Sequence, residues 1–325
     1  MHPAFSVIFL TTLIGVGQGL FLALFTGQSY AAAQFLPAQN GTGFFAMGSL
    51  IALLFLIGGL ISSIFHLGHP ERAWRAATKW RTSWLSREVI ALPLVMLFVF
   101  AYGVMHYMNW DMVIFVTSTG VKFNLSLLVG AIGSATVFIL FLCTAMIYAA
   151  IKFLQEWSSP LTIVNYLLLG TASGFTLATA FSLYTAPELV DFFGVWAIII
   201  TVMAFITRSA SLIRNARIKY KSSIQTAIGV RHNQIVQKAQ GAMGGSYNTR
   251  EYFHGKTAMF LKSIKWVFMI LVFPVPIILL SAGMDDGNGS VLLAAFLVQY
   301  TGLLAERWYF FAQSNHPQNI YYQTV

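Results

Sequence analysis

The sequence predicts an all-α, polytopic membrane protein with eight transmembrane helices, organised as a single integral membrane domain over residues 1–325. Three observations support this prediction. Hydrophobic residues make up 57% of the chain and charged residues only 9%, whereas soluble domains carry about 25% charged residues. Eight apolar runs are each long enough to cross about 30 Å of hydrocarbon. Finally, the basic residues are divided very unequally between the two sides that eight crossings create.

The eight expected helices follow from the apolar runs in chain order. The first run lacks a basic flank and is too long for the apolar part of a signal peptide, so we expect it to remain as a helix. Its Gly15 and Gly19 allow another helix to approach closely. The seventh run contains Pro274 and Pro276, which remove two backbone donors and predict a kink. The runs cover residues 4–26, 44–66, 88–108, 124–151, 160–183, 191–213, 264–283 and 290–311.

The charges predict the orientation of this bundle. Of the nineteen Lys and Arg residues, eighteen fall on the side that carries both termini, and Lys122 alone falls on the other side. Loops rich in Lys and Arg stay in the cytoplasm, and the rule is safest for short loops. We therefore expect the N and C termini, the 66–88 loop and the 208–263 segment to be cytoplasmic.

The segment 208–263 lies between the sixth and seventh helices and is the one large extramembrane piece. It begins with helical stretches that continue the sixth helix and breaks at Gly241–Gly245. Because it is too small for an independent domain, we interpret it as a cytoplasmic docking segment for a partner. A solvated linker with cations at the membrane surface is the alternative.

Several kinds of site are disfavoured by what the chain lacks. The basic residues flank membrane helices and form no stripe with interleaved aromatics, which argues against nucleic-acid binding. Cys143 is the single cysteine, so the chain has no intrachain disulfide and cannot supply the four thiolates of an iron–sulfur cluster. No two histidines face each other at similar depth within the helices, and no metal-ligand spacing occurs. We therefore expect no haem or metal in this chain.

Two ionisable residues stand at one membrane boundary. His66 ends the second apolar run and Glu88 begins the third. Because consecutive helices are antiparallel, these ends are expected to be near each other. An imidazole and a partly buried carboxyl can hydrogen-bond a quinone carbonyl and relay protons to it. A His at a helix C-terminus and a Glu at an N-terminus also interact favourably with helix dipoles, so spacing alone leaves both interpretations open.

Gln18 is a polar residue inside the first apolar run. A buried amide in lipid needs a hydrogen-bonding partner. Gln18 can supply part of the wall of a quinone site, or it can join two membrane helices, as polar side chains often do. The second role is the more common one.

The residues around this boundary resemble a known family. The run His66-Leu67-Gly68-His69-Pro70-Glu71-Arg72-Ala73, followed by Ser83-Trp84-Leu85-Ser86-Arg87-Glu88, resembles the membrane anchor subunit of bacterial dimethyl sulfoxide reductase. The resemblance implies a subunit that exchanges electrons between quinone and a ferredoxin-like iron–sulfur subunit, which in turn serves a molybdopterin catalytic subunit. It implicates His66 and Glu88 in quinone binding and proton transfer, with Arg72 ordering the loop.

A narrower resemblance is to the branch of this family found in cytoplasmic molybdenum sulfite dehydrogenases. It is carried by segments from Arg231 to Gly255 and from Glu306 to Asn319. It implies a subunit of the bacterial inner membrane that passes electrons from sulfite oxidation to ubiquinone or menaquinone, with both partner subunits on the cytoplasmic face. The alternatives are a dimethyl sulfoxide or sulfur-compound reductase that oxidises quinol, a passive anchor and a transporter. No midplane charge is expected in any span, which argues against a transporter.

Overall fold

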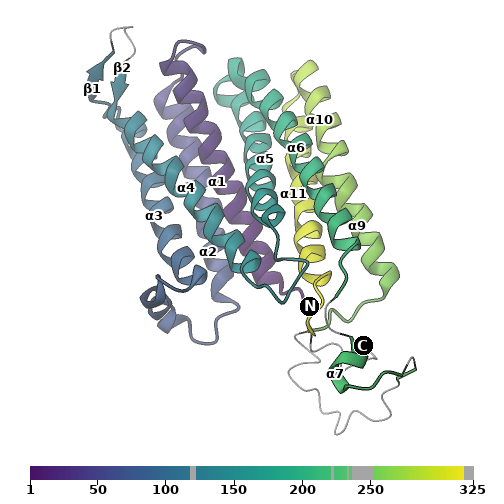
Figure 1. The fold of residues 1–325 in the computed structure, drawn as a ribbon. Coiled ribbons are helices and arrows are strands. Elements are labelled where there is room, and N and C mark those ends of the chain that lie inside the picture. The colour runs from purple at the N-terminus through teal and green to yellow at the C-terminus, as the bar shows by residue number, and fades with distance from the viewer. Residues whose placement is uncertain (118–121, 221–222, 233, 236–251, 318–325) are drawn as a thin grey trace.

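The computed structural model describes residues 1–117, 122–220, 223–232, 234–235 and 252–317. Among these residues it contains eight candidate membrane-spanning helices, which confirms the expected all-α fold. The spans pack side by side in alternating directions (Figure 1). They are α1 (Phe5–Ala32), η1 with α2 (Gly41–Ala46, Met47–Ile64), α3 (Trp84–Tyr107), α4 (Leu125–Ala149), α5 (Pro160–Thr185), η3 with α6 (Pro187–Leu189, Val190–Ala216), α9 with α10 (Ala258–Val272, Pro274–Asp285) and α11 (Gly289–Ala312).

The two ends of the bundle differ in what they carry. The N-terminus, the end of α11 and the short helix η2 (Pro70–Lys79) lie at one end, which we call the N/C face. A two-stranded antiparallel hairpin of β1 (Val113–Val116) and β2 (Lys122–Asn124) projects from the other end, the hairpin face. The sequence did not predict this hairpin, whose Phe115 and Phe123 rings stack with centroids 4.5 Å apart.

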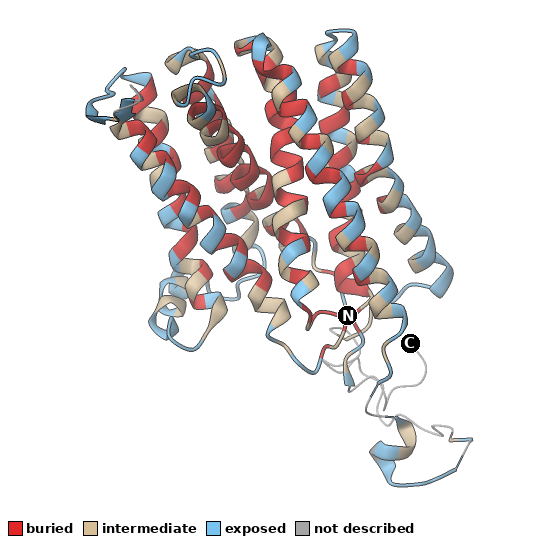
Figure 2. Cartoon of the chain, turned by 45° about the horizontal axis from the view of Figure 1, so that its top comes forward, coloured by how far each residue is buried: buried red, intermediate tan, exposed pale blue. Residues whose placement is uncertain are grey.

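The centre of the bundle is built around α1 and α5. Of the most apolar window of α1, 78% is buried, against 33% for the span formed by α9 and α10. Figure 2 shows buried residues along the inner faces of the helices and exposed ones on the outside. The exposed set includes large apolar side chains such as Leu54 and Phe100, which is the distribution that a lipid environment favours.

Glycines determine how closely α1 and α5 approach. A Cβ atom added to Gly174 would overlap the backbone of Gly19, and one added to Gly15 would lie 3.3 Å from Gly170. Both helices carry glycine four residues apart, so the bare backbones meet on one face of each helix. The close approach expected at Gly15 and Gly19 is therefore present, and its partner is α5.

Helix ends follow local sequence signals. The side chain of Ser83 accepts a hydrogen bond from the Ser86 amide at the start of α3, and Ser159 caps α5, whose first residue is Pro160. The expected break in the seventh span is also present, because α9 ends at Val272 and α10 begins at Pro274. These caps place Glu88 in the first turns of α3.

The docking segment is described only in part. Helix α6 continues to Ala216, as the sequence predicted, and is followed by the short helix α7 (Ile224–Ile228). Residues 236–251, which include the Gly241–Gly245 break, lie outside the described residues, as do 318–325 of the tail. At the far end of the segment, the ring of Tyr252 stacks on that of His316 beyond α11, with centroids 3.8 Å apart.

Candidate functional site

His66 lies just beyond the end of α2 at the N/C face and is exposed. The part of its ring that packs against the protein is desolvated, and this lowers the pKa of the imidazole below its ordinary value. The neighbouring Phe65 is 80% exposed, and Ile64 and Leu67 also present apolar surface. The imidazole ring of His66 therefore follows α2 in a stretch of exposed apolar residues.

Arg72 occupies the exposed helix η2, which follows His66 in the chain. Its guanidinium Nε lies 3.6 Å from the Glu71 carboxylate, and that carboxylate is also 3.1 Å from Nδ1 of His69. These contacts stay within the 66–88 loop. They are compatible with a role in ordering the loop, although exposed ion pairs contribute little stability.

Glu88 is buried and points into the bundle. Its side chain belongs to α3, with 7% of the residue exposed, and its Oε1 accepts a hydrogen bond of 2.5 Å from the Thr144 hydroxyl on α4. A buried carboxyl is stable only when hydrogen-bonded or paired. The structure records no contact between Glu88 and His66. The two therefore share one end of the bundle, one buried and one exposed.

Gln18 and Thr144, the hydrogen-bond partner of Glu88, line one small cavity. Its volume is about 30 Å³, and its walls include Gln18, Thr144, Tyr166 and Arg307. The amide nitrogen of Gln18 donates to the carbonyl oxygen of Val137, 3.1 Å away, so this side chain joins α1 to α4. The expected structural role of Gln18 is thus present, and the residue also borders the space next to Thr144.

The cavity suits water rather than a quinone ring. The lining includes two polar groups, the Tyr166 hydroxyl and the Arg307 guanidinium. A space of about 30 Å³ holds one water, which can bond several such groups. This cavity can therefore supply water to the Thr144 hydroxyl, which holds the inner side of the Glu88 carboxyl.

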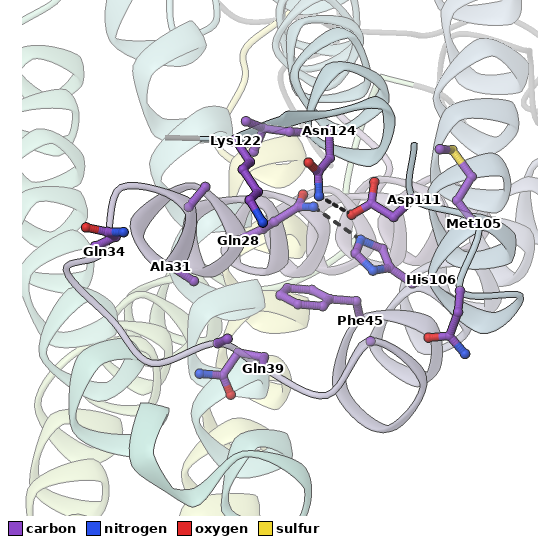
Figure 3. A pocket seen from close by; sticks show the side chains of 15 residues that line it. Gln28, Ala31, Gln34, Gln39, Phe45, Met105, His106, Asp111, Lys122 and Asn124 are labelled. Atoms are coloured by element: carbon purple, nitrogen blue, oxygen red, sulfur yellow. Dashed lines mark hydrogen bonds between the residues drawn. The ribbon is translucent and has the colours of Figure 1, made fainter. Parts of the chain in front are cut away.

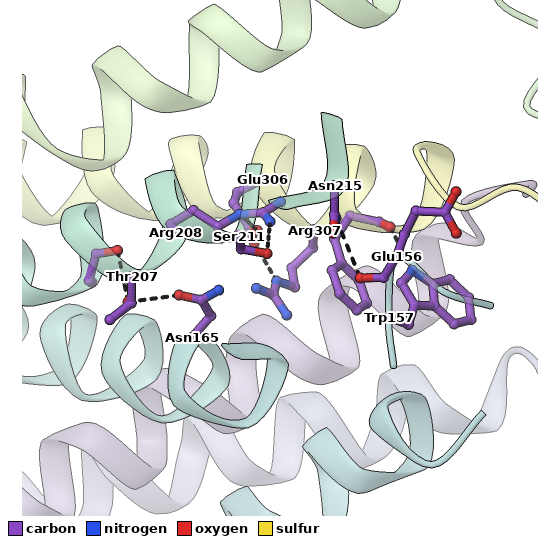
Figure 4. Close-up of polar contacts among 11 residues, drawn as sticks. Glu156, Trp157, Asn165, Thr207, Arg208, Ser211, Asn215, Glu306 and Arg307 are labelled. Atoms are coloured by element: carbon purple, nitrogen blue, oxygen red, sulfur yellow. Dashed lines mark hydrogen bonds and ion pairs between the residues drawn. The ribbon is translucent and has the colours of Figure 1, made fainter. Parts of the chain in front are cut away.

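A buried ionic cluster near this cavity was not expected from the sequence. Glu306 of α11 lies between two arginines, with its carboxylate 2.7 Å from Nε of Arg208 on α6 and 2.5 Å from Nε of Arg307 (Figure 4). All three residues are at most 4% exposed. The Arg307 guanidinium also lies 4.1 Å from the centroid of the Tyr166 ring. The cluster carries one net positive charge, and Arg307 brings it to the cavity beside Gln18.

The sequence counts these three charges with the side that carries both termini, and the structure buries them inside the bundle near that end. Arg208 precedes the end of α6 by eight residues and Glu306 precedes the end of α11 by six, which corresponds to about 12 and 9 Å along the helices at 1.5 Å per residue. The available signal was the adjacent pair Glu306-Arg307 inside an apolar run. Because ionisable groups within spans are rare and pair with one another, such a pair predicts a buried partner.

A second polar cluster ties the N/C face together. The buried carboxylate of Glu156, in the connection between α4 and α5, accepts hydrogen bonds from the Tyr220 hydroxyl at 2.5 Å and the Asn315 amide at 3.2 Å. Burial and this carboxylate raise the pKa of Tyr220. Arg214 at the end of α6 donates to the carbonyl oxygens of Gln155 and Ser158. The connections beneath α4, α6 and α11 therefore form one interlocked surface.

Among the described residues, no group of three or more His, Cys, Asp or Glu side chains is placed to hold a metal ion. His106, near the end of α3, is buried at the hairpin face, where its ring stacks on Phe45 with ring centroids 4.6 Å apart. His106 belongs to the last turn of α3, whereas His66 follows the end of α2, so the two histidines lie at opposite ends of the bundle.

Comparison with known proteins gives two matches. Residues 1–313 match the family described as DMSO reductase anchor subunit (DmsC). A sulfite dehydrogenase subunit of Allochromatium vinosum is 58% identical to this chain over 325 residues, which cover 100% of both proteins. Both matches extend over the helices that carry His66, Glu88, Gln18 and the buried ionic cluster.

Proposed function

Because the chain belongs to the DMSO reductase anchor subunit (DmsC) family, we propose that it is the quinone-reducing subunit of a sulfite-oxidising complex. The 58% identical relative is named as a subunit of sulfite dehydrogenase, and this favours sulfite oxidation over the alternative of a reductase that oxidises quinol. The observation that carries the proposal is the buried Glu88 carboxyl, held by Thr144 at the same end of the bundle as the exposed His66.

The proposed chemistry needs two electrons and two protons for each quinone. The electrons come from an iron–sulfur partner fed by a molybdopterin subunit, and the quinone is ubiquinone or menaquinone. His66 donates a hydrogen bond to one quinone oxygen and delivers one proton. Glu88 delivers the other proton, with its carboxyl oriented by Thr144. Both residues regain protons from the water side of the N/C face, so the product is the quinol.

The N/C face is the proposed docking surface for the iron–sulfur subunit. It carries the exposed cations of η2 and the following turn, and the contacts around Glu156 hold its connections together. The described part of 208–263 and the residues after α11 meet on the same surface, where Tyr252 stacks on His316. This face is proposed to be cytoplasmic, because the basic residues of short loops remain on that side of the inner membrane.

The reaction proposal is tested with His66→Ala and Glu88→Gln in the intact complex. Each variant should keep sulfite-dependent reduction of an artificial dye while its quinone-coupled activity falls at least about tenfold, equivalent to about 1.4 kcal/mol in the barrier. Glu188→Gln, an exposed carboxyl on the hairpin face, is the matched control. Parental quinone activity in both variants would remove these residues from the mechanism and return the chain to a passive anchor.

The docking proposal is tested by reversing charge on η2. Arg75→Glu combined with Lys79→Glu should release the catalytic subunits from washed membranes, because an acidic partner surface would then face acidic side chains. Asp285→Lys with Asp286→Lys, on the hairpin face, is the control. Full retention of the catalytic subunits by the η2 variant would exclude this helix from the interface.

A further inference from the structure

A cavity among the described residues lies on the hairpin face, away from the proposed quinone site. It has a volume of about 450 Å³ and is bordered by the ends of α1, α3 and α4 and by the connection before α2. His106 in its wall is eighteen residues beyond Glu88 on α3, which is about 27 Å along a helix. The cavity therefore belongs to the opposite side of the membrane and has no part in the chemistry proposed for His66 and Glu88.

Three amide oxygens in the wall of this cavity have no hydrogen-bond partner in the protein. They are Oε1 of Gln28, Oε1 of Gln39 and Oδ1 of Asn124. Gln28 is only 9% exposed, and its amide nitrogen is already used, since it donates to Ser126 Oγ at 2.8 Å. Leaving a buried acceptor unpaired costs about 1–3 kcal/mol. Three such acceptors around one space indicate a ligand that brings several N–H or O–H donors.

The cavity also contains one charge of each sign. The Asp111 carboxylate accepts hydrogen bonds from the Asn124 side chain at 2.5 Å and from the Ser126 amide at 3.2 Å, but no cationic side chain pairs with it among the described residues. Lys122 likewise has no described anionic partner. Figure 3 shows both side chains, together with Gln28 and His106, around the same space. A ligand that matches this wall carries both a cationic donor and an anion.

An apolar groove lies at the hairpin end of α2 and α3. It has a volume of about 220 Å³ and is bordered by α2 and α3, with Leu50, Leu53, Phe100 and Val104 in its wall. At its upper end Tyr107 and Ala46 are adjacent in the chain to His106 and Phe45 of the polar cavity. A polar cavity at the end of the spans, with an apolar groove beside it, matches an amphipathic molecule at the headgroup level of a bilayer.

We propose that the hairpin face binds a phospholipid with a primary ammonium headgroup, of the phosphatidylethanolamine class. The ammonium donates one of its three N–H groups to Asp111 and the other two to unpartnered amide oxygens, such as that of Gln28, and the phosphate pairs with Lys122. One acyl chain follows the groove between α2 and α3. A divalent cation fits less well, because the Lys122 ammonium in the wall repels it. A reacting quinone does not fit either, because the electrons arrive at the other face.

The test measures lipid retention by the full chain. The protein is reconstituted in nanodiscs of phosphatidylcholine containing a minority of phosphatidylethanolamine, and the lipid that remains bound after detergent release is counted by native mass spectrometry. The parental chain should retain phosphatidylethanolamine in preference to phosphatidylcholine, whose quaternary ammonium has no N–H donor. Asp111→Asn and Lys122→Gln should each lower this preference at least about tenfold. Asp285→Asn on the same face should not.

Folding and ligand source are controlled in the same preparation. Each variant should keep the parental helix content and the parental quinone-coupled activity, since neither residue belongs to the N/C face. Soluble glycerophosphoethanolamine carries the same headgroup without acyl chains. Added in excess over the lipid, it should fail to displace the bound phospholipid. Equal retention of both lipids by the parental chain, unchanged preference in both variants, displacement by the soluble headgroup, or replacement of lipid by calcium would each overturn the proposal.

Discussion

The hydroxyl of Thr144 on α4 donates a hydrogen bond of 2.5 Å to the carboxylate of Glu88 on α3. This contact joins neighbouring helices at the N/C end of the bundle and sets the direction in which the carboxyl points. Thr144 also borders the small cavity that has Gln18 and Arg307 in its wall. The hydroxyl that holds the Glu88 carboxylate therefore lies next to a space that suits a water molecule.

Thr144→Val tests whether this contact orients the carboxyl. Valine has nearly the same shape but cannot donate, so the variant loses one hydrogen bond worth about 1 kcal/mol. We expect quinone-coupled activity to fall about fivefold, with unchanged dye reduction. Thr136→Val is the matched control, because the Thr136 hydroxyl lies on the same helix and donates only to the Gly133 carbonyl. Equal activities of the two variants would show that Glu88 needs no orientation by Thr144.

Glu306→Gln tests the buried ionic cluster. The substitution leaves the guanidinium groups of Arg208 and Arg307 buried without a counter-charge, and breaking a buried pair in this way costs about 3–5 kcal/mol. A large fall in the thermal unfolding temperature in detergent is expected. The exposed Glu188→Gln should unfold at the parental temperature. If Glu306→Gln does the same, the ion pairs contribute no net stability.

Gly174→Ala tests the crossing of α1 and α5. The added methyl group would overlap backbone atoms of Gly19 and Leu20, which cannot move aside as a flexible side chain can. Overpacking of this kind costs about 1–3 kcal/mol. Gly58→Ala provides the comparison, because its methyl group would meet only Leu13 at 3.6 Å. Gly174→Ala should unfold at a lower temperature than Gly58→Ala, and the reverse order would contradict the crossing.

A pH series tests His66 in the quinol-oxidising direction, where a base must accept the proton of the quinol. Partial desolvation lowers the pKa of His66 below 6.5, so the ring is neutral at pH 7 and becomes charged only at more acidic pH. The rate should be constant above that pKa and fall as the pH drops through it. His66→Gln should lose this inflection, and an unchanged profile in the variant would assign the titration to another group.

Reporter fusions test the orientation. A cytoplasmic reporter at the end of the chain should be active, because the cations of the N/C face favour that side. A periplasmic reporter inserted after Trp110, next to the hairpin, should be active as well. Activity of a periplasmic reporter at the end of the chain would reverse the orientation and place the proposed docking surface outside the cytoplasm.

Much of this protein is readable from its sequence, because the bilayer imposes a local requirement. Every span must be a long apolar helix that satisfies its own backbone, so the eight runs, the break at Phe273 and the shared face of both termini follow from composition and length. The pairing of Gly19 with Gly174 depends on which helices become neighbours. The sequence identifies the first glycine as a contact, while only the packed bundle identifies the second.

For the polar residues too, the sequence predicts one part and the packing decides the other, but the physical reason differs. His66, Glu88 and Gln18 are recognisable as candidates because polar residues in or beside apolar runs are rare. What each of them contacts depends on helices far apart in the chain. Glu88 accepts a hydrogen bond from Thr144, and Gln18 donates one to the backbone of Val137. Glu306 of α11 forms an ion pair with Arg208 of α6. From the sequence, a charged residue near a helix end is expected at the membrane surface. Only tertiary packing decides whether that residue is solvated or buried against a partner.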